Sequence, residues 1–184
     1  MMEKIDWNSV EATTPGEFDR PQADGYVMKI VAAVNDPQKQ YLRLMLDIAE
    51  GDYKDIGHHT EIRTNQTWGY YILYRSYKEK ARGMFKGFLM ALEASNPSFK
   101  IATWNNDEKS FEGLLVGVVL GDEEYETQAR KIVTVQRPVR VLPVDDIRNG
   151  NFKVPALKKL ERPASSVNPQ MAGSGAPVDD DCPF

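Results

Sequence analysis

Hydrophobic and polar residues alternate most clearly over residues 41–48, in the sequence YLRLMLDI. The leucines at positions 42, 44 and 46, with Ile48, fall on one side of an extended chain, whereas Arg43 and Asp47 fall on the other. A period of two is the pattern of a strand that buries one face. This stretch therefore predicts a half-buried β-strand.

Two further stretches are rich in β-forming residues. Residues 25–34, GYVMKIVAAV, are expected to pair with residues 41–48 across a turn that contains Pro37. Residues 114–120, LLVGVVL, are apolar throughout. A short continuous apolar run is typical of a strand that is buried on both faces.

The β content continues in KIVTV at 131–135 and in RPVRVLPV at 137–144. Pro138 and Pro143 place this part at an edge, a bulge or a break, because proline cannot donate a hydrogen bond to a neighbouring strand. The sequence NGN at 149–151 predicts a turn.

One helix is expected between these strands. Ser76 and Glu79 have the spacing of a capping box, which predicts that the helix begins there. An apolar stripe then follows at helical spacing, and SNP at 95–97 ends the element; the stripe consists of Phe85, Phe88, Leu89 and Leu92. Gly83 and Gly87 are expected to permit close packing of this helix.

The order of elements is two strands, a helix and more strands, with no β-α-β alternation and no repeat. This order predicts a mainly β, α+β fold: a small, partly open β-barrel with one intervening helix. We divide the chain into an N-terminal arm at 1–23, a folded domain at 24–162 and a C-terminal tail at 163–184. Residues 163–178, PASSVNPQMAGSGAPV, carry no charge and little apolar area, so the tail is predicted to be a disordered tether.

The chain of 184 residues has a formal net charge of −4, which conceals an uneven distribution. Residues 130–162 hold 9 basic and 3 acidic side chains, whereas the segments on either side are acidic. A basic segment between acidic ones is compatible with a polyanionic partner, and equally with a solvated basic surface. The chain shows no signal peptide and no apolar run long enough to span a membrane, and it has one cysteine; we therefore expect a cytoplasmic protein.

The densest group of aromatic and basic residues lies at 68–88, in WGYYILYRSYKEKARGMFKGF. Single-stranded nucleic acid is bound by this combination, because bases stack on flat rings and cations follow the phosphates. The alternative is that several of these rings belong to the core. The candidate DNA-binding residues are Trp68, Tyr70, Tyr71, Tyr74, Arg75, Lys78, Lys80, Arg82 and Lys86.

The basic segment supplies a second set of candidates. In a strand over 137–141, Arg140 points away from Val139 and Val141, and therefore outward. We expect the cations of this segment to form the rim of a groove, although single surface cations more often serve solubility. The candidates are Arg130, Lys131, Arg137, Arg140 and Lys153.

Few residues suggest an enzyme. His58 and His59 are the only histidines and lack the spacing of a zinc site. The acidic stretch GDEEYE at 121–126 allows a metal-dependent nuclease as an alternative, but such a run is more often a solvated hairpin tip. No phosphate-binding loop, dinucleotide-binding motif or nucleophile elbow occurs. We therefore predict a protein with no catalytic residues, no metal and no cofactor.

Two regions resemble known single-stranded DNA-binding proteins. The end of the chain, PVDDDCPF, resembles the acidic tip of the bacterial proteins, with Cys182 where isoleucine or leucine is usual. Residues 24–160 resemble phage-encoded single-stranded DNA-binding proteins from Gram-positive hosts. The matching stretches are GYVMKIV, YRSYKEKARGMFKGF, FEGLLVGVVLGDEEY and DIRNGNFKVPALKKL.

The resemblance implies an OB-like barrel that binds and protects single strands in phage DNA replication or recombination. It also implies that the tip recruits replication, recombination or repair proteins: Asp179, Asp180 and Asp181 would meet basic residues, and Pro183 and Phe184 would enter an apolar pocket. A homo-oligomer is compatible with this reading, but no tetramer is inferred. The remaining alternative is a recombination mediator or adaptor whose main ligands are proteins.

Overall fold

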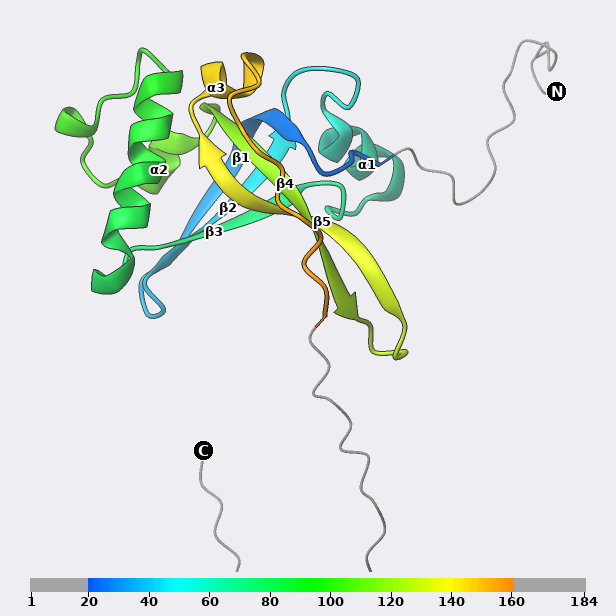
Figure 1. The fold of residues 1–184 in the computed structure, drawn as a ribbon. Coiled ribbons are helices and arrows are strands. Elements are labelled where there is room, and N and C mark those ends of the chain that lie inside the picture. The colour runs from blue at the N-terminus through cyan, green and yellow to red at the C-terminus, as the bar shows by residue number, and fades with distance from the viewer. Residues whose placement is uncertain (1–19, 161–184) are drawn as a thin grey trace, which may run out of the picture.

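Five strands form one antiparallel sheet in the order β3-β2-β1-β4-β5 (Figure 1). The structure, a computed structural model, describes residues 20–160. The predicted tail and nearly all of the predicted N-terminal arm lie outside this range. The strands are β1 (Gly25–Asp36), β2 (Tyr41–Ile48), β3 (Tyr71–Ser76), β4 (Leu115–Glu126) and β5 (Ile132–Leu142).

The predicted pairing of the first two strands is confirmed. β2 has the predicted bounds, and β1 extends the predicted strand by two residues to Asp36. Their register places Leu44 opposite Ala33 and Arg43 opposite Val34. Leu42, Leu44 and Leu46 are buried and Arg43 is exposed, as the period of two predicts.

The prediction that residues 114–120 are buried on both faces is also confirmed, since every residue from Val116 to Leu120 is buried. One face packs in the main core. The other is covered by α3 (Val144–Arg148), with Val144 and Ile147 against Val119. Gly117 allows this contact, because a Cβ there would lie 2.5 Å from the Ile147 side chain.

The two prolines lie where edges and breaks were predicted. β5 is an edge strand, and the register shifts between Val119 and Leu120, opposite Arg140 and Pro138. Pro143 follows the end of β5 and caps α3. β5 ends at Leu142, and the chain turns after Pro143 into α3, which was not predicted.

The predicted helix exists as α2 (Arg82–Ser95), and its buried residues are Phe88, Leu89, Ala91 and Leu92. The predicted capping box is wrong. Ser76 ends β3, where its hydroxyl donates to the carbonyl of Gln40, and a 3-10 helix, η1 (Glu79–Ala81), separates it from α2. The predicted end is confirmed, because Asn96 caps the helix and its side chain bonds the backbone of Leu115.

The expected packing role of Gly83 and Gly87 is wrong. Both lie on the solvent side of α2, and a Cβ at either position would meet nothing within 4 Å. The side of α2 away from the sheet therefore carries small residues next to Met84 and Met90, which are both exposed.

The elements between β2 and α2 were not predicted. α1 (Ile56–Thr64) and β3 follow β2, and His58 and His59 lie on α1. Figure 1 shows α1 at one end of the sheet and α2 at the other, with the β4–β5 hairpin projecting beyond both. No helix within residues 20–160 combines the length and apolarity needed to cross a membrane.

Candidate nucleic-acid interface

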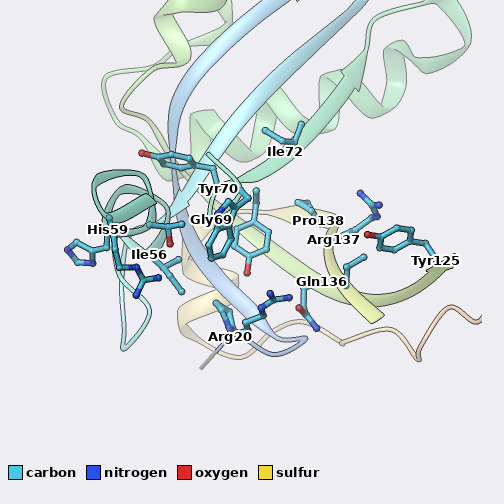
Figure 2. A pocket seen from close by; sticks show the side chains of 16 residues that line it. Arg20, Ile56, His59, Gly69, Tyr70, Ile72, Tyr125, Gln136, Arg137 and Pro138 are labelled. Carbon is cyan, nitrogen blue, oxygen red and sulfur yellow. The ribbon is translucent and has the colours of Figure 1, made fainter. Parts of the chain in front are cut away.

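A cavity of about 780 Å³ lies between α1, the start of β3 and the β4–β5 hairpin; we call it the seam cavity (Figure 2). β3 and β5 are the two outer strands of the sheet, and their Cα atoms approach within 8 Å of each other. The cavity thus sits beside the line where the two edges of the sheet meet. It is lined by Arg20, Pro21, Ile56, His59, Thr60, Arg63, Trp68, Gly69, Tyr70, Tyr71, Ile72, Tyr125, Val135, Gln136, Arg137 and Pro138.

A buried carboxylate fixes the α1 wall of the seam cavity. Asp47, which is 1% exposed, accepts hydrogen bonds from the backbone amides of Gly57 at 2.8 Å and His58 at 3.0 Å. These amides lie in the first turn of α1, where a helix has no internal acceptors of its own. The residue that would normally cap the helix, Asp55, is in the left-handed region and makes no side-chain cap. Asp47 therefore caps α1 from the neighbouring strand.

The same wall holds Tyr70 tightly. A Cβ on Gly57 would lie 2.3 Å from the Tyr70 ring, so only glycine allows this approach. The Tyr70 hydroxyl donates to Glu61 at 2.6 Å. Burial and, after it, the bond to Glu61 raise the pKa of Tyr70 to about 12. Tyr70 is only 8% exposed, so it supports the cavity wall rather than presenting a free ring face.

Two other predicted rings line the seam cavity with accessible surface. Trp68 is 51% exposed in the loop between α1 and β3. Tyr71 is partly buried against the core, and burial is the main cause that raises its pKa well above the usual value. Tyr125 closes the far side from the end of β4, next to Arg137 in Figure 2.

Three arginines from distant parts of the chain also line the cavity. Arg20 precedes β1, Arg63 belongs to α1 and Arg137 belongs to β5. Among the described residues that form the lining, none is acidic, although Glu123 holds Arg137 from outside with an Nε–Oε2 distance of 2.9 Å. Such a lining favours a ligand that carries both flat rings and negative charge.

The outer face of β2 and β3 continues from the seam cavity. Ile72 lines the cavity, and Tyr74 lies two residues further on the same face of β3. Tyr74 is 56% exposed, pairs with Arg43 of β2 across the sheet, and meets the ring of Tyr41 edge to face with centroids 5.4 Å apart. We call Tyr41, Arg43 and Tyr74 the sheet-face cluster.

The structure divides the remaining predicted DNA-binding residues among several places, so the groove predicted from 68–88 and 130–153 is not a single one. Lys78, Lys80, Arg82 and Lys86 lie at η1 and the start of α2, at the opposite end of β3 from the seam cavity. Arg75 turns inward over the Phe88 ring, and burial lowers its pKa. The others are spread over the surface: Arg130 and Lys131 at the hairpin turn, Arg140 on β5, and Lys153 after α3.

Five residues of the two sites were not predicted from the sequence: Arg20, Tyr41, Arg43, Arg63 and Tyr125. Tyr41 and Arg43 carried a usable signal, because both fall on the polar side of the period-two pattern in β2. For the other three residues no local signal exists, since only the folding of the chain brings them to the seam.

The acidic stretch at 121–126 makes contacts within the hairpin and with the segment after α3. Asp122 accepts from the Gln136 side chain, Glu123 pairs with Arg137 and Lys158, and Glu124 accepts from the amide of Leu160. Within residues 20–160, no group of three or more His, Cys, Asp or Glu side chains is arranged to hold a metal ion.

No protein-family model matches this chain, and no curated protein matches it. Function is consequently inferred from the geometry of the seam cavity and the sheet-face cluster.

Proposed function

We propose that this chain binds single-stranded DNA without strong sequence preference, in the seam cavity and along the sheet-face cluster. In phage DNA replication or recombination such binding would protect exposed strands. The observation that carries the proposal is the convergence of aromatic side chains and arginines from separate chain segments on one open cavity.

The topology supports an OB-like barrel. In the OB fold, five strands form a partly open barrel, and oligonucleotides bind on the face of strands 2 and 3 and at the loops that join strands 1 and 2 and strands 4 and 5. Here the sheet order is β3-β2-β1-β4-β5, and β3 and β5 approach each other. The sheet-face cluster occupies the face of β2 and β3, and Tyr125 lies at the end of β4, just before the turn into β5.

The chemistry supports single strands rather than duplex. Bases must be unpaired to stack on rings such as Trp68 and Tyr74, and each base stacked on an aromatic ring contributes about 1–3 kcal/mol. Every base has a π-face, so such contacts do not select a sequence. Arg20, Arg63 and Arg137 would then contact phosphates beside the stacked bases.

Fluorescence titration of the full chain with oligo(dT) at several salt concentrations tests the proposal, with duplex DNA and RNA of equal length measured in parallel. We expect oligo(dT) to bind more tightly than duplex. We also expect log K to fall with log salt by about 0.7 for each phosphate contact. Absence of binding, or an affinity independent of salt, would overturn it. Weak binding beside tight capture of a recombinase would favour the mediator alternative.

The acidic tip lies outside the described residues and remains a proposal from the sequence. We propose that Asp179 to Phe184 recruit replication, recombination or repair proteins. Deleting these six residues should leave the oligo(dT) affinity within about twofold while abolishing co-purification of such partners from the host. Loss of both properties together would contradict a separable recruiting segment.

A further inference from the structure

A second cavity, of about 370 Å³, lies at the α2 end of the sheet; we call it the helix cavity. Its walls come from the end of β1, the start of β2, the segment that follows β3, the first turn of α2 and the loop before β4. It is lined by Asn35, Leu42, Tyr77, Arg82, Phe85, Trp104, Asn106 and Glu108.

The aromatic walls of the helix cavity are held in place by the protein itself. Tyr77 meets Phe85 edge to face at 6.1 Å, and Phe85 lies 6.4 Å from Trp104. The Tyr77 hydroxyl donates to Asn35, and the Trp104 indole donates to Asp107 and Ser110. A ligand would therefore meet rings that are already ordered, which reduces the entropy cost of binding.

The polar groups of this cavity suit a flat, hydrogen-bonding ring next to negative charge. The amide side chains of Asn35 and Asn106 offer both donors and acceptors. Arg82 lies in the lining, and Lys78, Lys80 and Lys86 belong to the same turn and helix. The lining itself holds one cation and one acid, Arg82 and Glu108. The three lysines lie beside it, and so does Asp107, whose backbone carbonyl accepts from the Trp104 indole.

We propose that the helix cavity is a second subsite of the same DNA-binding surface and receives one nucleobase. This inference depends on the proposed function. β3 joins the two cavities with six residues, a length of about 20 Å. One strand that reaches both would have several nucleotides between them, which agrees with the range of site sizes known for OB domains.

An aromatic side chain of a partner protein is the other candidate occupant. Arg82 in the lining and the lysines beside it favour the nucleobase, because every nucleotide brings a phosphate with its ring. The small volume agrees with one base, since it lies near the lower limit for ligand pockets.

Titration with oligo(dT) of increasing length separates the two cavities. The affinity of the wild type should rise in a second step once the oligonucleotide reaches the helix cavity. Arg82→Ala and Asn106→Gly should remove that second step, with a loss of about fivefold or more for long oligonucleotides and none for short ones. Glycine is suitable at position 106 because Asn106 has φ +64°. Thermal melting of each variant checks the fold.

Lys86→Ala is the matched control, because Lys86 is a cation on the same helix but does not line the cavity. If Arg82→Ala and Lys86→Ala lose the same affinity for long oligonucleotides, general electrostatic attraction explains the loss, and the proposed subsite is wrong. Cross-linking with oligonucleotides that contain iododeoxyuridine should label Tyr77, Phe85 or Trp104 as well as residues of the seam cavity.

Labelling only at the seam cavity would overturn this inference and leave the proposed function intact, whereas absence of oligo(dT) binding would overturn the proposed function itself. Unchanged oligonucleotide binding in both cavity variants, together with a change in tryptophan fluorescence on adding the peptide DDDCPF, would assign the cavity to a protein side chain instead.

Discussion

Arg137 Nε lies 2.9 Å from Oε2 of Glu123, so an arginine of the seam cavity is already held by a carboxylate. The other Glu123 oxygen contacts Lys158 at 2.6 Å. Hydrogen bonds and charge, first from Lys158 and then from Arg137, hold the pKa of Glu123 below its usual value. Because both pairs are open to solvent, each contributes little stability. A phosphate that contacts Arg137 would therefore displace Glu123 at small cost.

Glu123→Gln should strengthen binding of single-stranded DNA. The substitution removes the charge that competes with phosphate for Arg137 and keeps the size of the side chain. Breaking an exposed pair of this kind corresponds to about 1 kcal/mol at most, so we expect up to about a fivefold gain in affinity for oligo(dT). Titration at low and moderate salt measures it.

Glu126→Gln is the control, because it removes the same charge from the same hairpin at an exposed position three residues away. Glu126→Gln should increase the affinity for oligo(dT) less than Glu123→Gln does, and its increase should disappear at a lower salt concentration. Equal gains from both substitutions would show that Arg137 has no specific role.

Tyr74 offers the clearest test of stacking on the sheet face. Tyr74→Ala should lower the affinity for oligo(dT) by about 1–3 kcal/mol. Its effect on folding should be small, because the ring is 56% exposed. Tyr74→Phe keeps the ring and should bind nearly as well as the wild type. If the two variants bind equally weakly, the hydroxyl matters and stacking does not.

The parts of the fold that could be predicted from the sequence are those with a regular apolar period. Leu42, Leu44 and Leu46 define β2 because each is buried on the same side, and Phe88 and Leu92 define α2 in the same way. The continuous apolar run in β4 was equally clear, since α3 and the main core cover both of its faces.

The unpredicted parts depend on contacts between distant residues. α1 has no apolar stripe, as Ile62 is 71% exposed, and its cap comes from Asp47 on β2. The seam cavity joins Arg20, Arg63 and Arg137, which no local pattern connects. Residues 68–88 were recognised as aromatic and basic. However, β3 separates the two ends of this segment, so that one end lines the seam cavity and the other lines the helix cavity.

Two helical glycines should respond in opposite ways to the same substitution. Gly57→Ala places a Cβ 2.3 Å from the Tyr70 ring and should destabilise the protein by about 1–3 kcal/mol. Gly83→Ala meets nothing within 4 Å and should stabilise α2 by about 0.5–1 kcal/mol. Thermal melting should show shifts of opposite sign. A stabilising Gly57→Ala would contradict the close contact with Tyr70.

Tyr70 should make stability fall at high pH. Its pKa is about 12 in the folded protein against 10.0 for a free tyrosine, so the neutral form favours folding. This contribution is complete below pH 10 and is lost as the pH rises toward 12. Tyr70→Phe removes the bond to Glu61 and should cost about 1 kcal/mol near neutral pH. Urea denaturation should show that the difference in unfolding free energy between the wild type and Tyr70→Phe becomes smaller above pH 10. A difference that does not change with pH would contradict the raised pKa of Tyr70.

Asp47 caps α1, and amide hydrogen exchange can test its effect at each residue of this helix. Asp47→Asn replaces one acceptor oxygen with a donor, so the amide of Gly57 or His58 loses its partner. Such a loss costs about 1–2 kcal/mol, and exchange in α1 should accelerate while α2 stays protected. Affinity for oligo(dT) should fall with it, because α1 is a wall of the seam cavity. Asp107→Asn, which alters an exposed cap of the 3-10 helix η3 (Glu108–Phe111), should leave the exchange of α1 and the oligo(dT) affinity unchanged. Unaltered exchange in α1 would show that packing on Tyr70 suffices to hold this helix.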